Sequence, residues 1–184
     1  MSSGDGFVNA SAFVVGPENP AAASLASMAR SLGFSSVAAY AGLKPAEKQA
    51  ARTPLIFFLC AAVADVKSLK PMADAIRFSP NLKLRFSPLI YFAKNPSVDS
   101  IKACIQMGFD DVIALPHRDL GERIFRQVGR PQAYYETTTY FGPDRRNGNV
   151  PRLAAEDGEF RRIEILRSPE NGVDVLHDDF QFVV

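Results

Sequence analysis

A run of apolar residues with no polar face is the feature that most constrains this chain. Residues 55–59 read Leu-Ile-Phe-Phe-Leu, so both faces of a strand formed there must be buried. Strands buried on both faces are typical of parallel sheets that are covered by helices on each side. A second apolar run occupies residues 88–92, and we expect it to be another strand of the same sheet.

The remaining segments alternate between strand and helix patterns. Gly33 and Gly108 end two of the expected helices, and Pro71 must lie in the first turns of a third or kink it. Five strands that are each followed by a helix predict an α/β fold with a parallel sheet and helices on both faces. The further strands are expected over 12–15, 36–40 and 111–114, and the helices over 20–32, 45–52, 64–78, 98–107 and 118–128.

Charge and composition change together near residue 130. Residues 1–130 carry 15 Lys or Arg against 10 Asp or Glu, whereas residues 131–184 carry 6 against 10. A Pro and a Tyr/Thr-rich stretch follow the last expected helix at the same point. We therefore predict an N-terminal tail over 1–10, an α/β domain over 11–130 and a C-terminal extension over 131–184.

The end of the extension has the pattern of a β-hairpin. Residues 160–166 alternate in polarity, residues 168–172 carry a turn signal, and 173–176 form a return strand to which 180–184 can add another. A hairpin of this size is marginally stable alone. An exposed apolar last strand also invites pairing with another edge. We therefore expect a homodimer or a complex with a partner protein.

Composition excludes several function classes. A formal net charge of +1 argues against a strongly basic DNA-binding protein. The longest apolar run, 54–63, is far shorter than the ~20 residues of a membrane helix. The chain has two cysteines, Cys60 and Cys104, each in an apolar run, and we expect both to be reduced core thiols. With no signal-peptide pattern at the N-terminus, the protein is expected to be cytoplasmic.

One local motif resembles a known family. Residues 108–116 read GFDDVIALP, which is similar to the G-A-x-D-[FY]-[IL]-x-K-P stretch of receiver domains of bacterial two-component response regulators. Residues 13–18 are similar to the opening strand of that family. The resemblance covers roughly residues 10–130 and implies a CheY-like, flavodoxin-like fold with five parallel strands, to which this chain adds the hairpin extension.

The resemblance places each phosphorylation function on a residue that cannot perform it. In the family an acidic pair holds magnesium, an Asp accepts the phosphoryl group, a hydroxyl binds its oxygens and a Lys pairs with it. We therefore expect a pseudo-receiver with no catalytic residues, no metal and no cofactor, which works by binding a signalling protein. The corresponding positions here are Gly16 and Pro17, with Glu18 beside them, Leu59 or Cys60, Ala93, and Leu115.

A motif in the extension is a second candidate binding site. The run from Tyr140 to Arg146, YFGPDRR, resembles an element in the tails of alphaproteobacterial receiver-like and other signalling proteins. One interpretation is structural: Tyr140 and Phe141 dock on the α/β domain while Asp144, Arg145 and Arg146 close a turn. A second is docking of a partner, because paired arginines suit carboxylates and phosphates. A third is a cyclic-dinucleotide contact, since PilZ domains also begin with two arginines.

Two alternatives for the function follow from these sites. The leading one is the phosphorylation-independent interaction module. The other is a sensor of a small ligand or cyclic dinucleotide, which would use the vacated pocket or the Asp144-Arg145-Arg146 element. Asp110 and Asp111 fall just before the last expected strand and are predicted to be turn residues. His177, beside two aspartates, lacks the further spaced ligands of a metal site.

Overall fold

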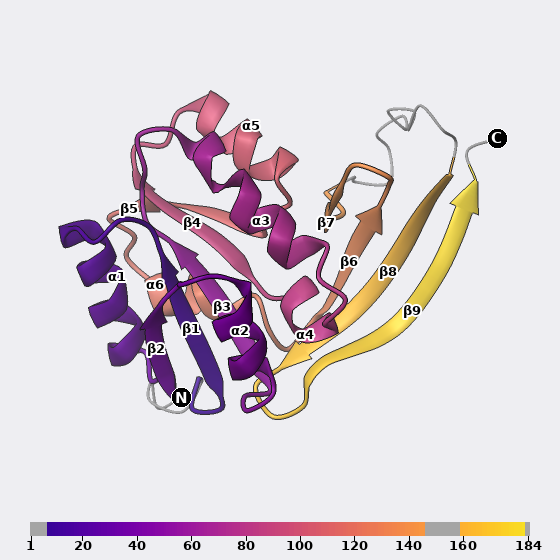
Figure 1. The fold of residues 1–184 in the computed structure, drawn as a ribbon, viewed down its shortest axis with the longest axis horizontal. Coiled ribbons are helices and arrows are strands. Elements are labelled where there is room, and N and C mark those ends of the chain that lie inside the picture. The colour runs from indigo at the N-terminus through magenta and orange to yellow at the C-terminus, as the bar shows by residue number, and fades with distance from the viewer. Residues whose placement is uncertain (1–6, 146–158, 183–184) are drawn as a thin grey trace.

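Two sheets form the fold of residues 7–145 and 159–182, which are the residues that this computed structural model describes (Figure 1). Sheet A has five parallel strands in the order β2-β1-β3-β4-β5. This is the flavodoxin-like strand order, which CheY shares. Sheet B has four antiparallel strands in the order β7-β6-β8-β9. The predicted α/β fold with a C-terminal β extension is confirmed.

Helices cover sheet A on both faces, as its apolar strands require. Helices α1 and α6 pack on one face, and the remaining helices pack on the other. The strands of sheet A are β1 (Ala10–Val15), β2 (Ser36–Ala39), β3 (Leu55–Cys60), β4 (Leu89–Lys94) and β5 (Asp111–Leu115). The helices are α1 (Pro20–Ser31), α2 (Leu43–Ala50), the 3-10 helix η1 (Val66–Leu69), α3 (Lys70–Arg77), α4 (Leu82–Arg85), α5 (Val98–Gln106) and α6 (Leu120–Phe125).

Strand β3 shows why the apolar run determines the architecture. Phe58 and Cys60 point into the core beneath α2, α3 and α5, whereas Phe57 and Leu59 point into the core beneath α1 and α6. All of these side chains are fully buried. None of the helices in the described ranges combines the length and the apolar character that crossing a bilayer would require.

Three details of the helices differ from the sequence-based expectation. The single helix expected over 64–78 is divided into η1 and α3, and Pro71 lies in the first turn of α3, where a missing N–H costs no helical hydrogen bond. Helix α4 was not expected, because four residues are too few to show a helical period. Helix α6 ends at Phe125 rather than at residue 128.

Sheet B contains β6 (Pro131–Glu136), β7 (Phe141–Pro143), β8 (Glu159–Ser168) and β9 (Gly172–Phe182). The predicted hairpin corresponds to β8 and β9. The sequence predicts a separate strand from residue 180, which is wrong for residues 180–182, because β9 continues to Phe182 without a break. Residues 183–184 lie outside the described range. A bulge at Leu176 lets it do so, since Ile165 pairs with Val175 and Glu164 pairs with His177.

Sheet B docks on the end of sheet A at which the parallel strands begin (Figure 1). Phe86, just before β4, packs against Tyr134 and Phe141 of sheet B. The turn of the hairpin reaches the start of β3, where a Cβ on Gly172 would lie 2.5 Å from the carbonyl oxygen of Pro54. The extension is therefore remote from the carboxyl ends of the strands, where ligands of such sheets usually bind.

Candidate functional site

The predicted phosphorylation-like positions lie at the carboxyl ends of neighbouring strands, as the sheet register requires. Val15 at the end of β1 pairs with Cys60 at the end of β3, and Lys94 at the end of β4 pairs with Leu115 at the end of β5. Gly16 follows β1 with φ of 141°, and a Cβ there would lie 3.2 Å from the Cβ of Ala61. The backbones of β1 and β3 thus approach closely where a receiver would hold its metal.

Packing fills the positions that would accept and hold a phosphoryl group. Leu59 and Cys60 are fully buried and point to opposite faces of the sheet, and Ala93 is 7% exposed. Leu115 is half-buried and packs against the core on the α1 and α6 face. These positions therefore contribute to the two cores rather than to an open polar site.

The two cysteine thiols are unsuited to act as nucleophiles. Burial raises the pKa of Cys60 far above its ordinary range, and the nearby Cys104 raises it further. Burial also raises the pKa of Cys104, to about 12, despite the opposing charge of Arg145. Because the thiolate is the reactive species, both groups are inert at neutral pH.

The residues at this end do not fit the magnesium ion of the receiver family. Magnesium requires an octahedron of oxygen ligands, usually with one or two carboxylates. Among the predicted pocket positions only Glu18 has a side-chain oxygen, and it is exposed. In residues 7–145 and 159–182, no group of three or more His, Cys, Asp or Glu side chains is arranged to hold a metal. We therefore derive no phosphoryl-transfer step at this end of the sheet.

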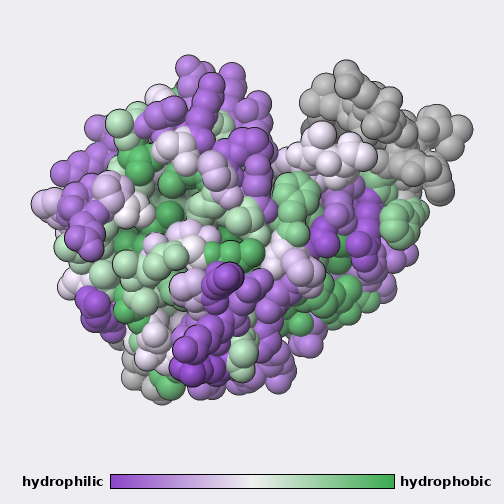
Figure 2. All heavy atoms as spheres, in the orientation of Figure 1, coloured by the Kyte–Doolittle hydropathy of each residue, from purple (hydrophilic) through white to green (hydrophobic). Residues whose placement is uncertain are grey.

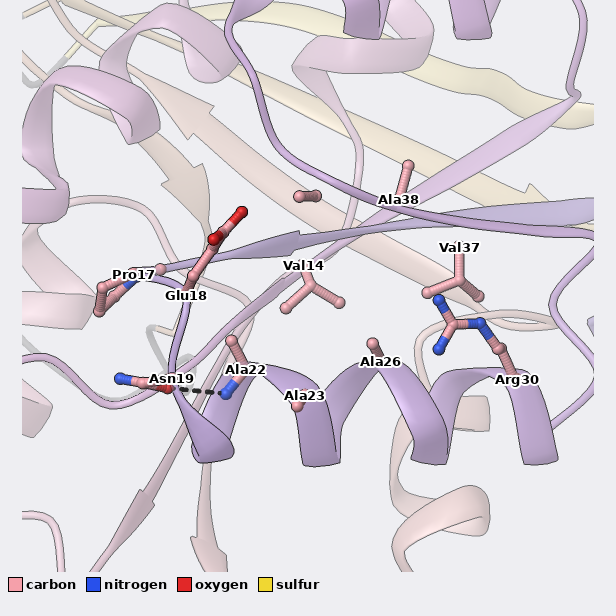
Figure 3. Close-up of a pocket in the computed structure, with 12 residues that line it drawn as sticks. Val14, Pro17, Glu18, Asn19, Ala22, Ala23, Ala26, Arg30, Val37 and Ala38 are labelled. Carbon is pink, nitrogen blue, oxygen red and sulfur yellow. Dashed lines mark hydrogen bonds between the residues drawn. The ribbon is translucent and has the colours of Figure 1, made fainter.

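A cavity of about 440 Å³ lies beside this end, between α1 and β2 (Figure 3). It includes three of the predicted pocket positions, Gly16, Pro17 and Glu18, whereas the other four do not line it. Small side chains from α1 and β2 form most of its wall, with the Glu18 carboxylate near one end and the Arg30 guanidinium near the other (Figure 3). The cavity is therefore apolar in the middle and charged at its ends.

A cluster of charged side chains lies at the opposite end of sheet A. Asp110, immediately before β5, has a side chain that is only 2% exposed. Its Oδ2 lies 2.6 Å from Nη2 of Arg77, and its Oδ1 lies 3.0 Å from Nη2 of Arg167. The hydroxyl of Tyr134 and the backbone N–H of Leu89 also donate hydrogen bonds to this carboxylate. Asp110 lies at the bend before β5, as expected, but the expectation missed the part of its carboxylate in this buried cluster.

The two arginines are held by backbone carbonyl groups as well as by the carboxylate. Arg77, in α3, donates from Nε to the carbonyl oxygen of Gly108 at 2.9 Å and from Nη1 to that of Ser87 at 2.9 Å. Arg167, in β8, donates from Nε to the carbonyl oxygen of Phe86 at 2.6 Å and from Nη1 to Gln132. Both side chains are almost fully buried. Arg167 thus fastens sheet B to the loop before β4.

The charge state of Asp110 follows from these neighbours. Burial by itself raises the pKa of this carboxyl group, but the positive charges of Arg167 and Arg77 outweigh that effect, and the pKa lies below its ordinary value of 3.8. Burial raises the pKa of Tyr134 above its ordinary range, and the negative charge of Asp110 raises it further. At neutral pH the cluster therefore contains one carboxylate, two guanidinium groups and a neutral phenol.

Aromatic packing surrounds this charged cluster. The rings of Phe86, Tyr134 and Phe141 lie with centroids 5.2–5.6 Å apart and form a small core with two isoleucines of β8. Gly108 has φ of +80°, and a Cβ there would lie 2.3 Å from the carbonyl oxygen of Phe141. The backbone before β5 and strand β7 thus approach each other as only a glycine at this position permits.

The tail motif makes its contacts at this same end. Phe141 is buried in the aromatic core, and Tyr140 stacks on Tyr135 with 4.6 Å between ring centroids. Arg145 donates to the carbonyl oxygens of Phe109 and Asp110, at 2.6 and 2.9 Å.

Of the two remaining charged residues of the motif, the structure describes only Asp144. Oδ2 of Asp144 lies 3.7 Å from Nε of Arg162. Arg146 lies outside the described residues. The partner-docking and cyclic-dinucleotide interpretations of the motif stay predictions.

The expectation that Asp111 is a turn residue is wrong, whereas the strand expected over 111–114 includes it. Asp111 is the first residue of β5, and its carboxylate accepts two hydrogen bonds from Arg123 of α6, at 2.6 and 2.8 Å. Arg123 is 36% exposed at its side chain, so this pair is much closer to solvent than the Asp110 cluster. Adjacent aspartates thus have different surroundings: one is enclosed by sheet B, and the other lies near the surface beneath α6.

No family model matches the chain, and no curated protein matches it. Solved structures with a similar fold are receiver or CheY-like domains. The receiver domain of a sensor histidine kinase from Pseudomonas aeruginosa PAO1 is 24% identical, and the match covers 63% of this chain and 94% of that one, with a TM-score of 0.41. A CheY-like protein from the same organism is 17% identical over 64% of this chain and 98% of that one, with a TM-score of 0.48. A response regulator from Chloroflexus aurantiacus is 18% identical over 64% and 95%, with a TM-score of 0.46.

Proposed function

We propose that this chain is a pseudo-receiver of bacterial signal transduction, which acts independently of phosphorylation by binding another protein. The observation that carries the proposal is the packing at the carboxyl ends of β1, β3, β4 and β5. Leu59, Cys60 and Ala93 are buried there, and none of them carries the carboxylate or hydroxyl group that the receiver family has at the corresponding positions. A protein with this fold that transfers no phosphoryl group can still act by binding another protein at its surface.

The joint between the two sheets supports a fixed rather than a switching role. A switch needs an element with two arrangements whose balance a ligand or modification changes. Arg167 of β8 fastens sheet B to sheet A through its buried ion pair with Asp110, which also pairs with Arg77 of α3. Separating the sheets would expose or unpair these charges, which is costly. We infer that the protein presents one constant surface to its partner.

Phosphodonor labelling tests the absence of phosphoryl chemistry. The full chain is incubated with radiolabelled acetyl phosphate and magnesium, beside a conventional receiver domain as positive control and a Cys60→Ala variant. We expect the conventional domain to be labelled and both forms of this chain to stay unlabelled. Magnesium-dependent labelling that approaches one phosphate per chain would overturn the proposal, and its loss in Cys60→Ala would identify the thiol as the acceptor.

A binding measurement tests the positive half of the proposal. Photo-crosslinking in cells identifies proteins that contact the chain, and each is purified and titrated against it with and without the phosphodonor and magnesium. We expect a dissociation constant that the phosphodonor leaves unchanged. An affinity that changes about tenfold or more on phosphodonor treatment of this chain alone would contradict phosphorylation independence.

The cavity between α1 and β2 favours a second candidate function, the sensing of a small ligand. Its volume of about 440 Å³ lies in the range of small-molecule sites. Thermal melting of the chain against ATP, GTP and cyclic dinucleotides tests this, because a ligand that binds only the folded state raises the melting temperature. The half-buried Ala26 lines the cavity, and Ala26→Phe fills it. A shift that is present in the original chain and lost in this variant supports a sensor.

A further inference from the structure

The outer edge of β9 is open for pairing with another strand. β9 is eleven residues long and ends sheet B, and no described strand lies on its outward side. Residues 174–180 are all exposed. An edge strand presents a row of unpaired N–H and C=O groups, which is a template for an added strand. Natural edges are protected by short length, lysines, prolines, bulges or inward-pointing charges. β9 has no lysine and no proline; it has the bulge at Leu176 and an inward-pointing Asp178 whose charge is paired with Arg161.

The pairing with β8 determines which side chains share a face of β9. Val175 lies opposite Ile165 and Phe180 lies opposite Arg161, so both point to the inner face that carries the aromatic core. They are 42% and 72% exposed, so two apolar side chains on the inner face of this edge are accessible. Figure 2 shows hydrophobic and hydrophilic residues side by side where Figure 1 places β8 and β9.

The outer face of the same edge is acidic. Asp174, His177 and Asp179 point to it, opposite Leu166, Glu164 and Arg162 in turn. Neither Asp174 nor Asp179 forms an ion pair with a residue that the structure describes. Asp178, in contrast, faces the inner side and is paired with Arg161 at 2.5 Å. Two exposed carboxylates are therefore available to an added strand.

We propose that the edge of β9 binds an extended segment of a partner protein by strand addition, and that this segment alternates basic with apolar residues. The proposal rests on the proposed role as a protein-binding module and specifies its surface. Backbone hydrogen bonds supply affinity in this mode, and alternate side chains supply specificity. Lys or Arg residues of the partner face Asp174 and Asp179, and apolar residues lie beside Val175 and Phe180.

Charge disfavours several of the registers in which two copies of this chain could pair through β9. Two copies that pair through β9 form an antiparallel pair about a two-fold axis. An axis half a residue beyond Leu176 places Asp174 opposite Asp179, and an axis at Asp178 or Asp179 places that residue opposite its own copy. Like charges directly opposite each other destabilise a sheet. A basic strand meets no such repulsion from Asp174 and Asp179, so these carboxylates favour a basic partner, and the homodimer expected from the sequence stays a prediction.

Synthetic peptides as long as β9 test the proposal. One labelled peptide alternates Lys and Val, a second alternates Glu and Val, and a third has the composition of the first with its lysines and valines in separate blocks. Fluorescence anisotropy with the full chain should show the alternating Lys/Val peptide binding about tenfold or more tighter than either control. Hydrogen exchange of the amides of residues 174–180 should slow when that peptide binds.

A charge-reversed variant locates the site. Asp174→Lys with Asp179→Lys should abolish the preference for the basic peptide and favour the acidic one. The matched control is Glu47→Lys with Asp99→Lys, which makes the same charge change at exposed positions of α2 and α5 and should leave binding unchanged. Thermal melts show that both variants are folded.

Three results would overturn the proposal. They are equal binding of all peptides, protection of amides elsewhere than β9, and a dimer in sedimentation analysis that charge reversal of β9 dissociates. None of them bears on phosphodonor labelling, so strand addition can fail while phosphorylation independence stands.

Discussion

The two ends of sheet A differ in how they treat polar side chains. At the carboxyl ends of the strands, where an α/β sheet usually carries its chemistry, Leu59, Cys60 and Ala93 are packed into apolar cores. At the amino ends, one carboxylate and two guanidinium groups are buried together beneath sheet B. Buried charges are tolerated only when they are paired and hydrogen-bonded. The comparison indicates that the charged groups buried in the Asp110 cluster hold the joint between the two sheets together.

The largest effect should come from removing the buried carboxylate. Asp110→Asn retains the shape of the side chain but leaves Arg77 and Arg167 buried without a counter-charge, and we expect unfolding free energy to fall by about 3–5 kcal/mol. Asp111→Asn is the matched control: its partner Arg123 is 36% exposed, so the loss should be at most about 1 kcal/mol. Urea titrations of both variants measure the difference. Equal losses would show that the joint is no more important than a surface pair.

A smaller effect is expected where the two sheets approach most closely. Gly108→Ala introduces a Cβ that would lie 2.3 Å from the carbonyl oxygen of Phe141, in a backbone conformation with φ of +80°. Gly129→Ala shares the conformational cost, with φ of +74°, but has open space around it. We expect losses of about 2–4 kcal/mol for the first and about 1–2 kcal/mol for the second. Thermal and urea unfolding measure the two losses of stability. Similar losses would mean that β7 moves away from the new Cβ with no loss of unfolding free energy.

The dependence of unfolding free energy on pH in acid should report the contribution of the same cluster. Because the pKa of Asp110 is lower in the folded protein than its ordinary value of 3.8, its ionised form stabilises the fold above that pH. This contribution is lost as the pH falls through the folded pKa. The stability gap between the original chain and Asp110→Asn should therefore be constant from pH 7 to about pH 5 and narrow below pH 4. Urea unfolding across that range tests this, and a gap that widens in acid would contradict the sign.

The smallest effect on stability is expected at the carboxyl ends of the strands of sheet A. Leu115→Lys restores the residue type that the receiver motif has at this position, and Leu115 is half-buried. A lysine there can extend its ammonium group to solvent, so we expect a loss below about 1 kcal/mol. Phosphodonor labelling should stay absent, because the acceptor and the metal ligands are still missing. Labelling of this single variant would show that the pocket needs only its lysine.

The parallel sheet was predictable because its signal is local. The run from Leu55 to Leu59 has no polar face, and a short run of this kind is typical of a strand that is buried on both faces. The glycine stops at Gly33 and Gly108 also lie where helices end. The positions of the apolar pocket residues could be anticipated too, because the strand ends of a parallel sheet lie at one edge.

The charged cluster could not be predicted from local patterns. Asp110 has the sequence context of a turn, and its partners lie 33 and 57 residues away. One signal was present: in the alternating strand β8, Arg167 falls on the same face as Ile163 and Ile165. An arginine on the inward face of a strand indicates a buried partner, but the sequence does not say which acidic residue supplies it.

The bulge at Leu176 makes the face pattern of β9 independent of a one-residue change in length at this point. Leu176 is the one residue of β9 without a counterpart in β8, so the strand accommodates it without a change of partners. Deletion of Leu176 would leave each later residue opposite its present partner and restore regular alternation. Asp178 and Phe180 would stay on the inner face, and His177 and Asp179 would stay on the outer face. A single codon deletion would therefore straighten this edge and keep its recognition pattern.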